Sequence, residues 1–295
     1  MMTDPATPVS DRIAISVDAA SPSSFLRTDG IDGFYQAPLR GYGRDVGWMS
    51  GRAVVLHDVV SLHAPAGGTL KPIARQQADT LLHPAYLERH ENLVRERLYV
   101  IRGDRRILLQ LSSHEPLMLG AMLLGPWPTG LMRLTQDAQG LYISPTPGLA
   151  EEARQQGRAI RTVAVRPVCR AGHYDGWGDH DGWGDHEGPA VHAAFGENPL
   201  GPSVAFDLGY RFGQVALRLV SAEPVTDMWI DLIALDLDPD AEVPGREAQW
   251  GFSGASLSFG AGDAAFNGGS GDGASADYSS ARGALGRAVE DAVTA

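Results

Sequence analysis

The chain has a single cysteine, Cys169, among 295 residues, so it cannot form an internal disulfide framework. We expect this thiol to be buried and structural. Basic residues are also few, since 24 Lys and Arg stand against 36 Asp and Glu and give a formal net charge of −12. Proteins that bind nucleic acid or anionic membranes gain affinity from a basic face. The charge balance therefore argues against nucleic acid and membrane as partners.

Long hydrophobic runs are absent as well. The most apolar stretch, Pro116 to Trp127, is shorter than the roughly 20 residues that a helix needs to span a bilayer. The opening residues, Met1 to Pro5, contain neither a basic region nor an apolar one, which disfavours a secretory signal. We therefore expect a cytoplasmic protein.

Short apolar segments with a two-residue period recur along the chain, as is typical of half-buried strands. The clearest pair is Leu93 to Tyr99 and Ile107 to Leu111, joined by a tight turn at Gly103 and Asp104. Arg97, Tyr99 and Ile101 alternate along the predicted strand with Leu98 and Val100, so the two sets lie on opposite faces. Further strands are predicted at 13–17, 52–63, 117–124, 131–134, 141–143, 160–168, 203–208, 214–220 and 228–237.

Helices are few in this pattern. Leu149 to Gln156 predicts a short helix that ends at Gly157, and Thr80 to Glu91 could form another, limited by Pro84. The 36 glycines and 19 prolines also argue against long helices. The sequence therefore predicts a mainly β protein, an antiparallel β-sandwich with Gly-rich loops and a short C-terminal helix.

Composition divides the chain into four parts. We predict a flexible leader at 1–11, the β-sandwich domain at 12–250, a flexible Gly/Ser/Ala-rich segment at 251–280 and a short amphipathic helix at 281–295.

The most unusual segment contains the hexapeptide Asp-Gly-Trp-Gly-Asp-His twice in tandem, between residues 173 and 187. Three interpretations remain open: a solvated loop lengthened by duplication, a metal site, or an aromatic platform for a ligand. Imidazole with carboxylate suits zinc or manganese, and carboxylate with carbonyl oxygen suits calcium. The candidate metal ligands are His173, Asp179, His180, Asp185 and His186. The candidate ligand-binding residues are Trp177, Trp183, Tyr174, Asp175 and Asp181.

Two other groups could carry function. Phe34, Tyr35, Tyr42 and Trp48 lie among glycines and arginines, where they could form a core or stack on sugar rings. The acidic segment that begins at Asp236 superficially resembles a calcium loop. It lacks the required glycine and is interrupted by prolines, so we interpret it as a solvated loop.

The stretch Glu96 to Leu111, continuing into Pro116 to Leu119, resembles the strand–turn–strand pattern in the N-terminal β-sandwich of glycogen-debranching-type (amylo-α-1,6-glucosidase-like) proteins. Ser24 to Gly30 and Gly43 to Asp45 are similar to the opening of that domain. The resemblance covers about a third of the chain and contains no diagnostic motif. In that family a catalytic helical barrel follows the sandwich, and nothing after residue 150 could build one here. The resemblance therefore implies a carbohydrate-associated sandwich without its own hydrolase.

The function predicted first is a non-catalytic binding or interaction module, with carbohydrate as the leading ligand class. No nucleophile elbow, zinc-protease helix motif or Walker loop occurs, so no catalytic residue is assigned. The alternatives are a metal-dependent hydrolase or lyase that uses the His/Asp cluster, and a structural protein whose segment 251–295 binds another chain.

Overall fold

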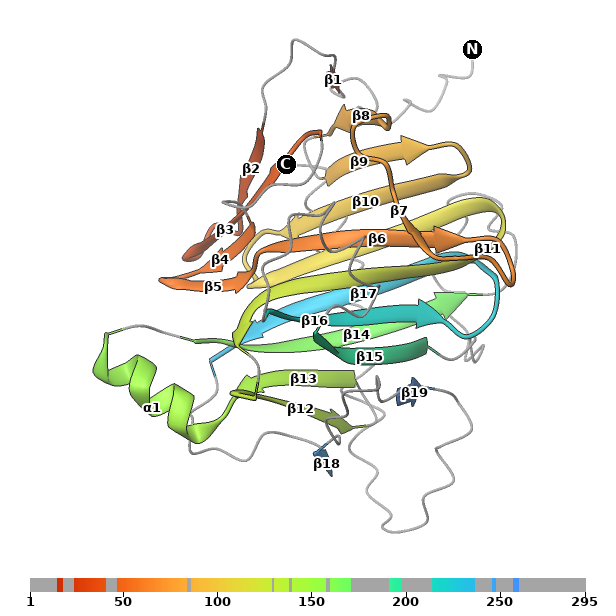
Figure 1. Ribbon diagram of the computed structural model, residues 1–295. Coiled ribbons are helices and arrows are strands. Elements are labelled where there is room, and N and C mark those ends of the chain that lie inside the picture. Colours follow the sequence, from red (N-terminus) through yellow and green to blue (C-terminus); the bar gives the residue numbers. More distant parts are fainter. Residues whose placement is uncertain are drawn as a thin grey trace, which may run out of the picture.

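A computed structural model of the chain shows an antiparallel β-sandwich (Figure 1). It describes residues 15–17, 24–40, 47–83, 86–128, 130–137, 140–157, 160–170, 191–197, 214–236, 246–247 and 257–259. The mainly β, antiparallel fold predicted from the short alternating segments is confirmed.

Two large sheets share one strand, and a third, smaller sheet packs against them. In spatial order, the first contains β1 (Ile15–Val17), β8 (Asp79–Leu82), β9 (Tyr86–Glu91), β10 (Val94–Ile101), the first half of β11 (Arg106–Pro128), β17 (Val225–Leu235), β14 (Thr162–Arg170), β13 (Gly140–Pro145), β12 (Met132–Asp137) and β18 (Arg246–Glu247). The second contains β7 (Lys71–Pro72), β6 (Asp58–Ala64), the second half of β11, β16 (Gln214–Ser221), β15 (Val191–Glu197) and β19 (Leu257–Phe259). The smaller sheet is β2 (Ser24–Thr28), β3 (Gly33–Pro38), β4 (Gly47–Ser50) and β5 (Ala53–Leu56).

Strand β11 is the link between the two large sheets. Its 23 residues pair first with β10 and β17, and then with β6 and β16. The register to β17 shifts between Ser112 and Leu117, where His114, Glu115 and Pro116 are exposed. A proline and a register shift are both typical of a point where a strand bends. The predicted separate strand at 117–124 is therefore the second half of one bent strand.

The alternating residues of these strands build one core between the sheets. Leu98 of β10, Leu109 of β11, Ile230 of β17 and Leu217 of β16 are all 0–1% exposed and belong to the same buried cluster. Each such side chain contributes about 1.5–3 kcal/mol by leaving water. Cys169 joins this core at 3% exposure, which confirms the prediction of a buried thiol.

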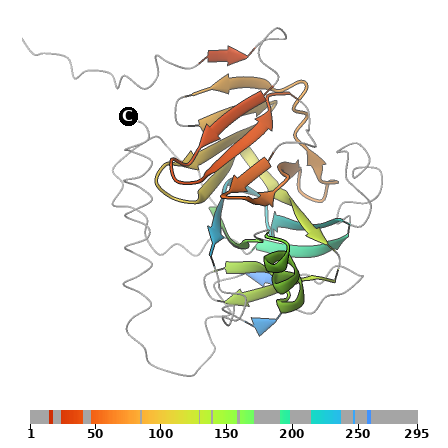
Figure 2. The same cartoon turned by 90° about the vertical axis from the view of Figure 1, so that its left-hand side faces the viewer.

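The small sheet β2–β5 lies across one end of the sandwich, and Figure 2 views the molecule from that side. Its inner residues Tyr35, Trp48 and Val55 are at most 1% exposed and join the main core. Tyr35 and Trp48 therefore serve as core residues, one of the two uses that the sequence allowed for this aromatic group. Phe34 points the other way, and Tyr42 lies outside the described residues.

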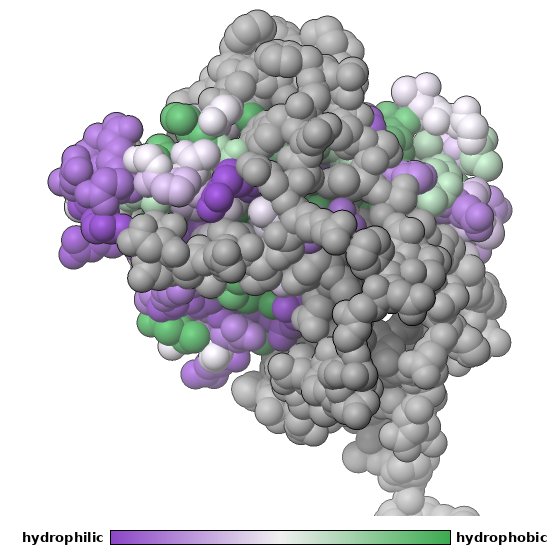
Figure 3. Space-filling view, turned by 90° about the horizontal axis from the view of Figure 1, so that it is seen from below, coloured by the Kyte–Doolittle hydropathy of each residue, from purple (hydrophilic) through white to green (hydrophobic). Residues whose placement is uncertain are grey.

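Helix α1 (Pro147–Gln155) is the helix predicted near 149–156. It begins two residues earlier because the Thr146 hydroxyl accepts a hydrogen bond from the Leu149 amide at 3.5 Å and Pro147 fits the first turn. Gly157, with φ of 65°, follows its C-terminus. Ala150 and Ala153 face the body, and the outward surface on this side of the molecule is hydrophilic (Figure 3).

The helix considered at 80–91 is wrong. Asp79–Leu82 and Tyr86–Glu91 are the strands β8 and β9, which pair with each other. Pro84 lies between them, where its ring cannot continue a helix. The predicted hairpins at 93–111 and 131–143 are confirmed as β10–β11 and β12–β13.

Candidate functional site

The tandem hexapeptide segment lies outside the described residues. The metal candidates His173, Asp179, His180, Asp185 and His186 and the ligand candidates Tyr174, Asp175, Trp177, Asp181 and Trp183 all fall in that segment. Their roles stay predictions. Strand β15, which begins at Val191, follows the segment along the chain.

A row of aromatic rings crosses the outer face of the first large sheet. Tyr86 of β9 lies opposite Tyr99 of β10, and Trp229 of β17 lies one strand further across, beyond β11. The ring centroids of Tyr86 and Tyr99 are 5.1 Å apart, and those of Tyr99 and Trp229 are 6.3 Å apart. His83 extends the row, since its ring stacks on Tyr86 at 4.3 Å. These spacings are typical of interacting aromatic pairs.

The rings differ in how much of them reaches solvent. Tyr99 is 5% exposed and packs with Ile101 and Leu108, whereas Tyr86 and Trp229 are only partly buried. Burial raises the pKa of the Tyr99 hydroxyl to about 12, so this group stays neutral over the physiological range. Tyr86 and Trp229 are therefore the rings that a ligand could contact.

Polar groups flank the row on the same face. Arg97 donates to Glu88 at 2.6 Å and lies over the Tyr86 ring at 5.2 Å. Burial alone would lower the pKa of Arg97, but the hydrogen bond to Glu88 raises it. On the other side, the Trp229 indole and the Gln110 amide donate to Asp227 at 2.5 and 3.1 Å. The face thus combines accessible ring surface with fixed hydrogen-bonding groups, as ligand sites do.

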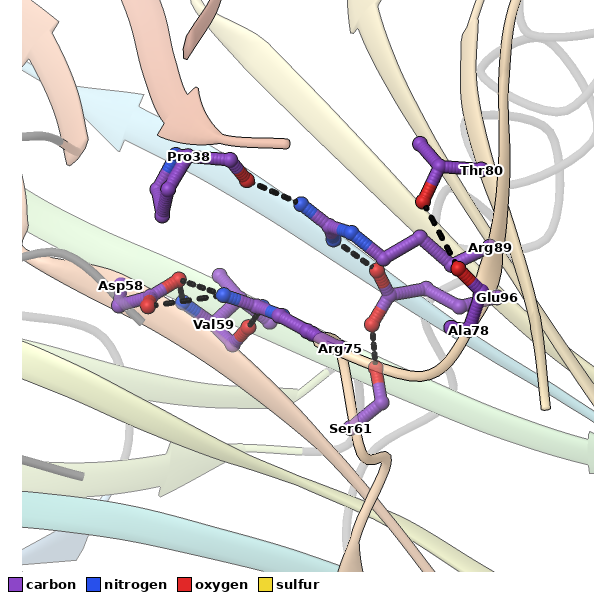
Figure 4. Close-up of polar contacts among 9 residues, drawn as sticks. All are labelled: Pro38, Asp58, Val59, Ser61, Arg75, Ala78, Thr80, Arg89 and Glu96. Carbon is purple, nitrogen blue, oxygen red and sulfur yellow. Dashed lines mark hydrogen bonds and ion pairs between the residues drawn. The ribbon is translucent and has the colours of Figure 1, made fainter. Parts of the chain in front are cut away.

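A second polar cluster lies inside the sandwich (Figure 4). Arg75 donates two hydrogen bonds to Asp58, at 2.9 and 3.1 Å, while Arg89 pairs with Glu96 and donates to the Pro38 carbonyl at 2.8 Å. Ser61 of β6 donates to the second oxygen of Glu96. The four charged side chains are at most 3% exposed. Because they are paired and closed to water, this cluster holds the sheets together and does not present a reactive group.

The pKa values of the two carboxyl groups in this cluster are shifted in opposite directions. Burial raises the pKa of Asp58, and the attraction of Arg75 only partly offsets it. Burial would also raise the pKa of Glu96, but Arg89, Arg75 and the Ser61 hydroxyl together lower it. Burial likewise raises the pKa of the Tyr35 hydroxyl nearby.

A third cluster, at the surface, joins four segments that are distant in the sequence. Arg105 binds Asp32 through two hydrogen bonds of 3.0 and 2.7 Å and also pairs with Asp236. Arg161 pairs with Asp236 and lies 3.8 Å from Asp32. Asp236, the first residue of the acidic segment, therefore pairs with two arginines, and residues 237–245 of that segment lie outside the described residues.

The chain matches no protein-family model and no curated protein. Among the described residues, no group of three or more His, Cys, Asp or Glu could hold a metal ion. In the same part of the chain, no helix has the length and hydrophobicity needed to cross a membrane.

Sequence reasoning missed the aromatic row. The parity shared by Arg97 and Tyr99 was readable, and so was the position of Trp229 between Met228 and Ile230 in an alternating segment. The order of the strands could not be predicted from the sequence. Tyr99 and Trp229 share one face only because β10 and β17 both pair with β11.

Proposed function

We propose that this protein is a non-catalytic carbohydrate-binding module whose ligand packs on Tyr86 and Trp229. The row of rings on the outer face of a β-sandwich is the observation that supports this function. Aromatic faces pack against the C–H faces of sugar rings, while arginine, carboxylate and amide groups hydrogen-bond the hydroxyls. The resemblance of Glu96 to Leu111 to a carbohydrate-associated sandwich points to the same ligand class.

The charges beside the rings favour a neutral sugar. Arg97 is paired with Glu88, and Arg106 donates two hydrogen bonds to Asp231, at 2.7 and 2.6 Å. An anionic sugar would have to compete with these carboxylates for the arginines. A neutral oligosaccharide can instead accept from the arginines and donate to the carboxylates without breaking either pair.

Calorimetric titration with a panel of neutral oligosaccharides tests the proposal. We expect binding by the wild type, and a loss of at least tenfold in affinity, about 1.4 kcal/mol, in Trp229→Ala and Tyr86→Ala. Leu93→Ala is the matched control, because Leu93 is an exposed apolar residue at the far end of β9 and β10. No binding to any member of the panel would overturn the function.

The tandem segment is the second place where a sugar could bind. If the wild type binds and the Trp229 and Tyr86 variants bind equally well, the site is not on the sheet face. Trp177→Ala and Trp183→Ala then test the segment directly, since their indoles would be the stacking surfaces there.

A further inference from the structure

The carboxylate two positions before Trp229 lies beside its indole on β17. Successive side chains of a strand point to opposite faces, so Asp227 and Trp229 share the outer face, while Met228, 0% exposed, lies in the core. The Trp229 indole donates to one oxygen of Asp227 at 2.5 Å. Hydrogen bonds to a charged acceptor are roughly twice as strong as those between neutral groups. The carboxylate therefore fixes the direction in which the indole N–H points.

The neighbouring strand β11 fixes this carboxylate in turn. Gln110 lies opposite Trp229 in the register, and its amide reaches diagonally to the other oxygen of Asp227 at 3.1 Å. Both oxygens of Asp227 thus accept a hydrogen bond, and the two donors come from different strands. Because hydrogen bonds weaken steeply when they are misaligned, these two contacts hold the Asp227 side chain in one orientation.

The other neighbours of Trp229 do not fix its ring in this way. The Tyr99 ring centroid is 6.3 Å away, whereas full contact between two ring faces requires about 3.5–4.0 Å between carbon atoms. Val168, opposite Trp229 on β14, is 40% exposed and offers an apolar contact, which has no preferred direction. The hydrogen bond to Asp227 is therefore the contact that selects one orientation of the indole.

A ring that is already held binds a ligand at a lower cost. A side chain that becomes immobilised on binding loses part of the affinity to its own ordering, and a preorganised side chain avoids this loss. We propose that Asp227 is a positioning residue, which holds the Trp229 indole in the orientation that receives the sugar. Asp227 acts through this ring and does not itself contact the ligand. The assignment rests on the proposed function of this face.

A double-mutant cycle tests the assignment, with the tightest ligand from a panel that includes maltohexaose and cellohexaose. We expect Asp227→Ala to weaken binding by about two- to tenfold, and to add nothing when introduced into Trp229→Ala. Asp227→Asn should bind within about twofold of the wild type, because its amide oxygen still accepts from the indole and the Gln110 amide can turn over to match. Asp79→Ala, which removes an exposed carboxylate on β8 of the same sheet, is the matched control. A further loss from Asp227→Ala in the Trp229→Ala background would overturn the assignment, because Asp227 would then contact the ligand itself.

Hydrogen exchange of the Trp229 indole N–H gives a second readout, which needs no ligand. Its signal in a proton–nitrogen NMR spectrum is the one that Trp229→Phe removes. We expect this N–H to exchange about tenfold faster, or more, in Asp227→Ala than in the wild type and in Asp227→Asn. Circular dichroism checks that each variant is folded.

The two measurements separate failure of the assignment from failure of the proposed function. Equal indole exchange in the wild type and in Asp227→Ala contradicts the positioning role, whatever the affinities are. If no sugar binds the wild type but indole exchange responds as expected, the proposed function is wrong, and Asp227 is shown to hold a ring that receives no sugar.

Discussion

Arg89 and Glu96 face each other across β9 and β10 and form an ion pair inside the sandwich, with side chains 0% and 1% exposed. The pair reaches all three sheets. Ser61 of β6 donates to Glu96, and Arg89 donates to the Pro38 carbonyl at the end of β3. Removing one partner of an ion pair that water cannot reach is costly, because the remaining charged group is neither paired nor hydrated.

Replacing Glu96 with glutamine should therefore destabilise the protein strongly. The variant leaves Arg89 buried without a counter-charge, and we expect the free energy of unfolding to fall by about 3–5 kcal/mol. Urea unfolding followed by circular dichroism measures this change. Glu115→Gln, on an exposed residue, should stay within about 0.5 kcal/mol of the wild type. A Glu96→Gln variant as stable as that control would show that the pair contributes little.

The effect of Glu96 should depend on pH in a defined direction. Its folded-state pKa lies below the ordinary value of 4.5, because Arg89, Arg75 and Ser61 outweigh the effect of burial. The stabilisation by its carboxylate is therefore complete above the unfolded-state pKa and is lost as the pH falls through the folded-state pKa. The difference in unfolding free energy between wild type and Glu96→Gln should be largest near neutral pH and shrink in acid. A difference that stays constant from neutral to acid pH contradicts this assignment.

Gly125→Ala should strain the second half of β11. A Cβ atom at residue 125 would lie 2.1 Å from the Trp127 ring, which is buried and packs at 5.9 Å from Phe195. Forcing the ring aside should cost about 1–3 kcal/mol and change the near-UV circular dichroism. Gly148→Ala is the control, since nothing lies within 4 Å of the added atom in α1. That variant should be neutral or gain up to about 1 kcal/mol.

Cys169 should be unreactive in the folded protein. Burial raises the pKa of its thiol to about 12, and Asp227 adds to the effect, so the reactive thiolate is scarce near neutral pH. A thiol-specific reagent such as DTNB should label the native chain slowly and the urea-unfolded chain at once. Rapid stoichiometric labelling without denaturant would place the thiol at the surface.

Local periodicity was enough to predict the hairpin of β10 and β11 and the helix α1, since each depends on residues close in sequence. It could not show that β11 continues past Ser112, because the alternation is interrupted where the strand bends. Periodicity also could not distinguish the buried Asp58 from a carboxylate at the surface. The charge of Asp58 is tolerated inside the protein because Arg75, 17 residues later in the chain, folds back to pair with it.

The aromatic row shows the same limit for function. Each ring could be found in a strand, but their convergence needs the order of β9, β10, β11 and β17. The tandem repeat of histidine and tryptophan can be read directly from the sequence, whereas a face assembled from distant strands cannot.

The shared strand also determines when the protein can fold during its synthesis. β11 ends at residue 128, but its partner in the second sheet, β16, begins at residue 214, and β17 of the first sheet follows at residue 225. A nascent chain that stops before residue 214 has one neighbour for each half of β11 and no way to complete either sheet. Both sheets must therefore close late and nearly together, after most of the chain has left the ribosome. Until then the apolar face of β11 depends on partners that have not yet been made.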